Sequence, residues 1–253
     1  MDLIDAQGRK TREVTAPNLC GGMGGNPYKL DNDWTSFPLA SFFTDKVAHV
    51  VMQNDAVATL QAERSFGAAR GSNDCVYATW STGIGFGLCV DGQLLGGKRG
   101  NAGHAGHSYY TESNPSVCGC GNVGDMEGTL SGHALARAWQ VKSGLASAST
   151  LDLFTAARTG HADAAALVSQ AAYRFGTVLY NLAVTLDTEL FVMGGSVFGH
   201  NQDVLLPELN RGLKRGMGVI TRDIRIVPAA LGDRTADLGA LSLVMPKSWD
   251  TAP

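Results

Sequence analysis

Residues 75–90 read CVYATWSTGIGFGLCV, in which two apolar, β-rich runs flank a glycine-rich segment. The run from Cys75 to Trp80 predicts a buried strand, Leu88 to Val90 predicts a second one, and Asp91-Gly92 predicts a tight hairpin turn after it. Glycines between the strands let backbone N–H groups approach a phosphate closely, and the Thr82 hydroxyl adds a donor. Residues 82–87 are therefore a candidate phosphate loop, although a glycine-rich turn with nothing bound explains them equally well.

The rest of the chain predicts an α/β protein in which strands and helices alternate. Residues 1–44 read as irregular, and residues 96–125 form a long segment without periodicity that collects histidines and cysteines. Loops of that length inside a compact domain are usually functional or disordered. The other expected elements are strands at 47–52, 190–193 and 224–227, and helices at 56–69, 127–141, 152–157, 162–185, one after residue 195, and 234–244.

Composition excludes several classes of function. The chain has 253 residues, 44% of them hydrophobic, which is enough for one large domain or two lobes with a sizeable core. Its net charge is −3, and no cluster of lysine and arginine forms the basic surface that nucleic acid or an anionic membrane requires. No apolar run approaches the roughly 18 residues of a membrane span, and residues 1–10 lack the apolar core of a signal peptide. We expect a cytoplasmic protein with a small-molecule ligand, bound to neither nucleic acid nor membrane.

Four side chains of metal-binding type fall in or at the end of the long irregular segment, namely His107, Cys118, Cys120 and Asp125. One imidazole, two thiolates and one carboxylate are all ligand types that zinc accepts. The total of five cysteines, an odd number, fits metal or thiol chemistry better than a disulfide framework. The pattern predicts a structural zinc site, and the alternative is two free cysteines in a turn-rich loop.

Two acidic residues stand where a catalytic or ligand-binding carboxylate could lie. Asp55 follows the expected strand at 47–52, and the ends of strands are where open α/β sheets carry their ligand chemistry. Its carboxylate could accept a proton from a substrate hydroxyl, but an aspartate before a helix is also a common N-cap. Glu127 opens an expected helix, where it could contact a ligand or remain a solvated first-turn acid.

Two nucleotide-binding patterns fail. The stretch from Gly92 to Lys98 has the spacing of a Walker A loop, but Arg99 replaces the magnesium-binding Ser or Thr and no helix is expected to follow. Gly119, Gly121 and Gly124 match G-x-G-x-x-G by count, but they interleave with cysteines and follow no expected strand. Neither segment is predicted to bind a nucleotide.

The order and spacing of the remaining motifs resemble the ROK family of bacterial sugar kinases and related repressors, over essentially the whole chain. The motifs that carry the resemblance are Asn54-Asp55-Ala56, residues 81–87, Gly103-His104-Ala105-Gly106-His107, Cys118-Gly119-Cys120-Gly121-Asn122-Val123-Gly124, Glu127, Val192-Met193-Gly194-Gly195, and Leu231-Gly232-Asp233 to Leu238-Gly239-Ala240. The resemblance implies a two-lobed α/β fold of the actin/hexokinase (ribonuclease H-like) type, with the active site in the cleft. Residues 1–74 would form part of the small lobe and residues 75–253 the large lobe, with the terminal helix packing back toward the small lobe.

The resemblance also implies an ATP-dependent kinase that uses Mg²⁺ and phosphorylates the 6-hydroxyl of glucose or N-acetylmannosamine, as a homodimer or homotetramer. Asp55 would be the catalytic base, and a structural Zn²⁺ would bind His107, Cys118, Cys120 and Asp125. The sugar-binding residues implied are Asn54, His104, His107 and Glu127. The residues implied for phosphate and nucleotide contacts are Thr82, Gly83, Gly85, Gly87, Gly194 and Gly195.

Three departures from the family pattern qualify these expectations. Asp125 stands where the family has a fourth cysteine, and His104 stands where it has a glutamate, as in bacterial N-acetylmannosamine kinases. The family's amino-terminal Asp-x-Gly-Gly-Thr phosphate loop has no counterpart in the sequence, so we expect an incomplete small lobe and impaired phosphoryl transfer. The alternatives are therefore a non-catalytic sugar-binding subunit or a fragment of a sugar-responsive repressor, although the upstream helix-turn-helix module of such repressors has no counterpart either.

Overall fold

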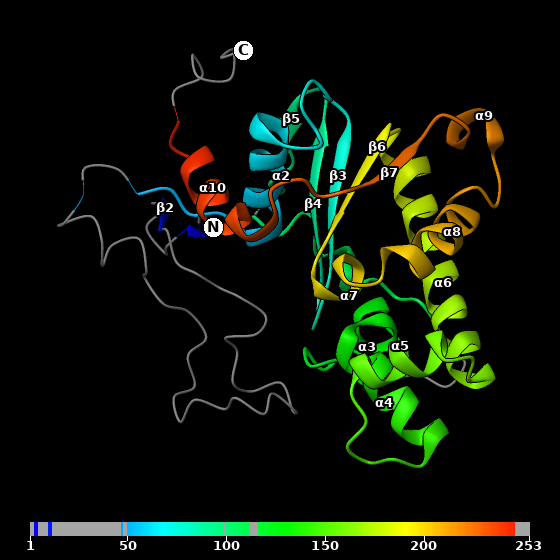
Figure 1. The fold of residues 1–253 in the computed structure, drawn as a ribbon. Helices are drawn as coiled ribbons and strands as arrows, with labels where there is room; N and C mark the ends of the chain where they lie inside the picture. Colours follow the sequence, from blue (N-terminus) through cyan, green and yellow to red (C-terminus); the bar gives the residue numbers. More distant parts are fainter. Residues whose placement is uncertain are drawn as a thin grey trace.

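The computed structural model describes residues 3–4, 10–11, 47, 50–98, 100–111 and 116–245, and its centre is a five-stranded mixed sheet (Figure 1). The strands are β3 (Cys75–Trp80), β4 (Ile84–Val90), β5 (Gln93–Leu94), β6 (Leu190–Gly194) and β7 (Arg225–Pro228), in the order β5-β4-β3-β6-β7. Strands β3, β6 and β7 run parallel, whereas β4 is antiparallel to β3 and to β5. The carboxyl ends of the three parallel strands therefore lie side by side along one edge of the sheet, the edge formed by strand ends. A separate two-stranded pair, β1 (Leu3–Ile4) and β2 (Lys10–Thr11), completes the strands.

The β3–β4 hairpin extends further than the sequence indicates. Trp80 pairs with Ile84, so only Ser81, Thr82 and Gly83 form the turn, and Gly85 and Gly87 lie inside β4. The prediction of a loop over residues 82–87 was therefore wrong for residues 84–87, because the antiparallel ladder with β3 continues through Gly85 and Gly87. The turn predicted at Asp91-Gly92 is confirmed, since both residues have positive φ, as this tight hairpin requires.

Helices cover both faces of the sheet. Helices α2 (Asp55–Phe66) and α10 (Thr235–Ser242) lie together on one side, and the remaining helices lie on the other side (Figure 1). That second set comprises α3 (Met126–Leu130), α4 (Gly132–Ser143), α5 (Thr150–Arg158), α6 (Ala162–Leu186), α7 (Ser196–Gly199), α8 (Gln202–Leu213) and α9 (Gly218–Thr221). Short 3₁₀ turns, η1 (His104–His107) and η2 (Gly232–Arg234), occur in the connections.

The alternation of side chains along β3 divides the core into two clusters. Cys75 and Tyr77 pack with Leu60 of α2, whereas Val76, Ala78 and Trp80 pack with α6 and its neighbours. Trp80 stacks on Phe175 of α6, with ring centroids 4.5 Å apart. The strand is thus buried on both faces, as its nearly continuous apolar sequence predicts.

Most predicted elements occur within two or three residues of their expected bounds, and, besides the early start of β4, two do not. The helix expected over 127–141 is interrupted at Ser131, whose hydroxyl caps α4 by accepting a hydrogen bond from Ala134 N (3.3 Å). The strand expected over 47–52 was wrong where it can be compared, because residues 50–54 have no regular secondary structure. None of the described strands pairs with that segment, and a strand without a hydrogen-bonded neighbour is not stable.

Helix α10 packs on α2, where a Cβ at Gly239 would lie 3.5 Å from the Ala58 backbone. This contact places α10 beside the helix that carries Asp55. The division into lobes at residue 74 remains a prediction. Among the described residues, no helix combines the length and the apolar character needed to cross a bilayer.

Candidate active site and metal centre

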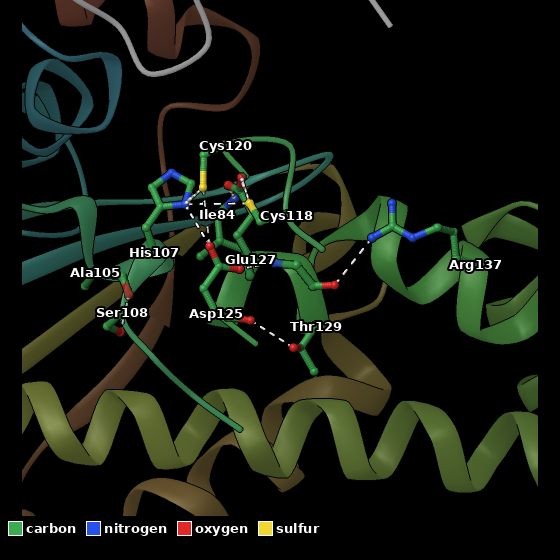
Figure 2. Close-up of polar contacts among 11 residues, drawn as sticks. Ile84, Ala105, His107, Ser108, Cys118, Cys120, Asp125, Glu127, Thr129 and Arg137 are labelled. Atoms are coloured by element: carbon green, nitrogen blue, oxygen red, sulfur yellow. Dashed lines mark hydrogen bonds and ion pairs between the residues drawn. The ribbon is translucent and has the colours of Figure 1, made fainter. Parts of the chain in front are cut away.

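Side chains of four predicted ligands converge on one point beside the sheet (Figure 2). His107 Nδ1 lies 3.1 Å from Asp125 Oδ2, 3.7 Å from Cys118 Sγ and 3.4 Å from Cys120 Sγ. Cys120 Sγ lies 3.6 Å from the same Asp125 oxygen, and one ligand atom from each residue falls within 4.8 Å of all the others.

These distances fit a tetrahedral zinc ion. Bonds of about 2.0 to 2.3 Å from zinc to nitrogen, oxygen and sulfur place neighbouring ligand atoms roughly 3.3 to 3.8 Å apart. The donor set contains two soft thiol sulfurs, which favour zinc over magnesium or calcium. Cys118, Cys120 and Asp125 are buried, so the arrangement is that of a closed structural site and not of an exposed acidic cluster.

Two glycines bring His107 and His104 to this point. A Cβ at Gly103 would lie 2.2 Å from the Phe86 carbonyl oxygen, and a Cβ at Gly106 would lie 2.5 Å from that of Ile84. Gly103 also has a positive φ of 94°. The η1 turn therefore rests directly on the backbone of β4, and this contact fixes where both histidine rings lie.

The two cysteines lie on a tight turn of their own. Cys118 N donates to Asn122 O (2.8 Å), and Gly121 N donates back to Cys118 O (3.0 Å). Burial raises the pKa of the Cys118 thiol above its ordinary value, and the nearby Glu127 and Asp125 carboxylates raise it further. A thiolate at this position therefore needs a cation beside it, which a bound metal would provide.

Glu127 connects the cluster to the β3–β4 turn. Its Oε2 accepts a hydrogen bond from Ile84 N (2.8 Å), and its Oε1 accepts one from the Cys118 thiol (3.4 Å). Gly83 leaves room for this contact, because a Cβ there would lie 2.8 Å from Glu127 Oε2. Glu127 is thus held between the turn and the cysteines, and is not the solvated acid of the alternative interpretation.

His104 lies next to these groups, with its ring centroid 6.0 Å from that of His107. Burial lowers the pKa of His104, and so does His107, whereas the Glu127 and Asp55 carboxylates act in the opposite direction. The net shift is downward, so His104 is neutral near pH 7 and can both donate and accept a hydrogen bond. The Asp55 carboxylate is therefore close enough to influence the pKa of His104, although α2, which carries it, covers the other face of the sheet.

Asn54, not Asp55, caps helix α2. Asn54 Oδ1 accepts hydrogen bonds from Ala56 N (3.0 Å) and Val57 N (3.4 Å). Asp55 is the first residue of the helix and is exposed, with its Oδ1 accepting from Ala56 N (2.8 Å). The N-cap interpretation of Asp55 was therefore wrong, which leaves its carboxylate open to solvent at the start of α2.

The glycines predicted to contact phosphate divide into two groups. A Cβ at Gly87 would lie 2.4 Å from Ala56 O, and one at Gly85 would lie 3.6 Å from Ala56 Cβ, so both lie against α2. Of the residues predicted to contact phosphate in this segment, only Thr82 and Gly83 lie in the β3–β4 turn, where Thr82 is exposed.

Gly194 and Gly195 reach the same edge from β6 and serve close packing there. A Cβ at Gly194 would lie 2.3 Å from the Tyr77 hydroxyl, and one at Gly195 would lie 2.4 Å from Trp80 O. Gly195 also has a positive φ of 87°. The two glycines therefore let the end of β6 lie directly on β3, beside the turn that carries Thr82.

A cavity of about 700 Å³ lies between the start of α2 and α10, and sequence analysis did not identify it. It shares Asp55 with the candidate site but includes neither histidine nor Glu127. Asp233 and Thr235 also line it, and the motifs that contain Asp233 and Gly239 were singled out in the sequence without any indication of a cavity.

Comparison with known proteins connects these features to one family. The family model described as "ROK family" matches residues 27–247. A glucokinase of Pyrobaculum calidifontis is 32% identical over 207 residues, which cover 82% of this chain and 69% of that protein. An N-acetylmannosamine kinase of Salmonella paratyphi B is 43% identical over 124 residues, which cover 49% of this chain but only 42% of the kinase.

Solved structures agree with the sequence comparisons. The ROK hexokinase of Thermus thermophilus superposes with a TM-score of 0.71 at 32% identity, over 81% of this chain and 71% of that one. A ROK family glucokinase of Streptomyces griseus, solved with glucose and AMPPNP, gives a TM-score of 0.71 at 28% identity, over 83% and 73% of the two chains. The predicted fold class, the actin-like fold of sugar kinases with an α/β sheet, is thereby confirmed. The family match spans most of the chain, and the chain therefore belongs to the ROK family, whose members include sugar kinases.

Proposed function

We propose that this chain acts as an ATP-dependent kinase that transfers phosphate to the 6-hydroxyl of glucose, N-acetylmannosamine or a related hexose. The observation that carries the proposal is the convergence of His104, His107 and Glu127 beside the metal-ligand cluster. Three polar side chains held at fixed positions by backbone contacts suit the recognition of several hydroxyl groups at once.

Each residue has a distinct role in sugar binding. Because Nδ1 of His107 faces the cluster, its Nε2 remains for a sugar hydroxyl. Neutral His104 can donate or accept, whereas Glu127 can only accept. Asn54 would contribute its amide nitrogen, since its Oδ1 is engaged in capping α2.

Asp55 is the residue we assign as general base. An exposed carboxylate at the first turn of α2 can take the proton of the sugar hydroxyl as that oxygen attacks the γ-phosphate. The rest of phosphoryl transfer is positioning and charge neutralisation. Thr82 and Gly83 at the turn, with Gly194-Gly195 beside it, are the groups nearest to the sheet edge where Mg²⁺-ATP would lie.

A zinc ion, where bound, would supply a fixed cross-link and no chemistry of its own. His107, Cys118, Cys120 and Asp125 would hold it, and their convergence supports this assignment. In that arrangement His107 serves the metal through one ring nitrogen and the sugar through the other, so the metal fixes the ring orientation. An ATP-dependent enzyme of sugar metabolism is also consistent with the cytoplasm, and we propose a homodimer or homotetramer as its assembly.

A phosphorylation assay over a panel of hexoses and N-acetylhexosamines tests the proposal. ADP release is followed for each sugar with Mg²⁺-ATP, with Asp55→Asn as the matched inactive control, and calorimetry measures sugar binding in parallel. Slow, sugar-dependent ADP release by the parent, in keeping with the expected impairment, and its loss in the variant are the expected result. Sugar binding without ADP release would instead identify a non-catalytic sugar-binding subunit, and light scattering on the same sample gives the oligomeric state.

A further inference from the structure

Asp125 uses its two carboxylate oxygens for different purposes. Oδ1 accepts a hydrogen bond from Gly128 N (2.7 Å) and caps helix α3, whereas Oδ2 faces His107 Nδ1 (3.1 Å) and Cys120 Sγ (3.6 Å) (Figure 2). The residue is only 1% exposed, so neither oxygen is supported by bulk water.

Helix α3 depends strongly on this cap. It contains only five residues, far fewer than an isolated helix needs to be stable. Asp125 is also joined to the helix through its backbone, since Thr129 Oγ1 donates to Asp125 O (2.8 Å). Gly128 packs closely against both Asp125 and Cys118, since a Cβ built on it would lie 2.9 Å from Asp125 Oδ1 and 3.1 Å from Cys118 N. The start of α3 therefore has little room to move relative to the cap.

The same short helix carries Glu127. Because Glu127 Oε2 accepts from Ile84 N (2.8 Å), the position of α3 determines where this carboxylate meets the β3–β4 turn. A displacement of Asp125 would therefore also displace Glu127, which lies in the first turn of the same helix.

A carboxylate performs both tasks with two separate oxygens. A cysteine at position 125 supplies one sulfur, which can bind the metal but is a weak hydrogen-bond acceptor and so caps Gly128 N much less well. An asparagine keeps an acceptor for Gly128 N but offers the metal a neutral and much weaker ligand. We propose that Asp125 is a positioning residue that couples metal binding to the placement of Glu127, so that loading the metal site locks α3. The inference rests on the metal site and sugar site of the proposed function, but its test requires no catalysis.

The experiment measures zinc affinity by competition with a chelating dye, and amide hydrogen exchange of residues 126–131 with zinc and after chelation. In the parent chain, zinc should slow exchange in α3 by at least 10-fold. Asp125→Cys should bind zinc as tightly as the parent or more tightly, yet lose most of that protection. Asp125→Asn should show parent-like exchange without metal and bind zinc at least 10-fold more weakly.

Ser131→Ala provides the matched control, because it removes the cap of the adjacent helix α4 without touching the metal ligands. Its zinc affinity and the protection of residues 126–130 by zinc should equal those of the parent. Full protection of α3 in zinc-loaded Asp125→Cys would overturn the proposal, as would zinc binding to the parent without protection or no zinc binding at all. None of these outcomes depends on whether the chain phosphorylates a sugar, so a failed kinase assay and a failed coupling are distinguishable.

Discussion

Substitution of Gly106 by alanine tests whether the backbone contact between η1 and β4 places the histidines. Gly106 does not have a positive φ, so alanine introduces no backbone strain of its own. Its new Cβ would lie 2.5 Å from the Ile84 carbonyl oxygen, and ordinary contact begins near 3.4 Å, so the two must separate by about 0.9 Å. Ile84 is buried and paired with Trp80 in the sheet, so we expect η1 to give way and not β4.

The required shift is large compared with the tolerance of a metal site. Ligand distances are held to within about 0.2 Å, and His107 directly follows Gly106. We therefore expect Gly106→Ala to displace the imidazole and to weaken zinc binding by about 100-fold, the upper end of what loss of a supporting contact costs.

Gly119→Ala is the matched control. Gly119 lies between the two cysteines of the same site, but nothing lies within 4 Å of a Cβ built there, and its φ is not positive. Competition with a chelating dye should give the parent affinity for Gly119→Ala and the large loss for Gly106→Ala. If Gly106→Ala binds zinc within about threefold of the parent, or if both variants lose affinity equally, the backbone contact does not position His107.

Three further outcomes follow from the site and its supports. Asp55→Asn should lower kcat at least about 100-fold with sugar binding retained, and a variant that keeps a tenth of the parent rate would show that Asp55 is not the base. His104→Glu should change the ratio of kcat/KM for glucose and N-acetylmannosamine by about 10-fold or more, and an unchanged ratio would place sugar selection elsewhere. Glu63→Gln should lower the free energy of unfolding in urea by about 2 kcal/mol. Glutamine keeps one oxygen to accept from the backbone of Ala230 and Leu231, but its NH2 group would face Ala68 N, which donates to Oε2 of the fully buried Glu63 (2.7 Å). Glu208→Gln, which removes only a surface ion pair, should cost less than about 1 kcal/mol, and equal losses in the two variants would contradict this account.

Elements with a strong local signal could be predicted from the sequence. Strand β3 is a nearly continuous apolar run, and the 25 residues of α6 keep helical spacing throughout. Asp91-Gly92 could be assigned because few other pairs tolerate two consecutive positive φ angles. In each case the residues that produce the signal lie within the element itself.

Features that depend on a distant partner could not be predicted in this way. The break at Ser131 allows Gly132 N to donate to Ser81 O (2.8 Å), a contact across 51 positions that helical periodicity does not reveal. The role of Gly87 could not be predicted either. The sequence does not distinguish a glycine that allows close packing of a helix from a glycine that allows close approach of a phosphate. The residue types in the long irregular segment predicted the four candidate metal ligands, but not that Asp125 also caps a helix.

The placement of Asp55 follows from the same principle, since contacts far from it in sequence hold its helix. Near the start of α2, Gly87 lets the carbonyl group of Ala56 lie directly on β4. Near the other end, the buried Glu63 carboxylate binds the backbone of Ala230 at 3.0 Å, in the segment that leads to α10. One of these contacts comes from the sheet and the other from the segment after β7, so parts of the chain that follow α2 in sequence help to set the position of Asp55. The proposed base and the two histidines proposed to bind sugar thus share one support, strand β4, since η1 rests on the carbonyl groups of Ile84 and Phe86 while α2 rests on Gly87 of the same strand.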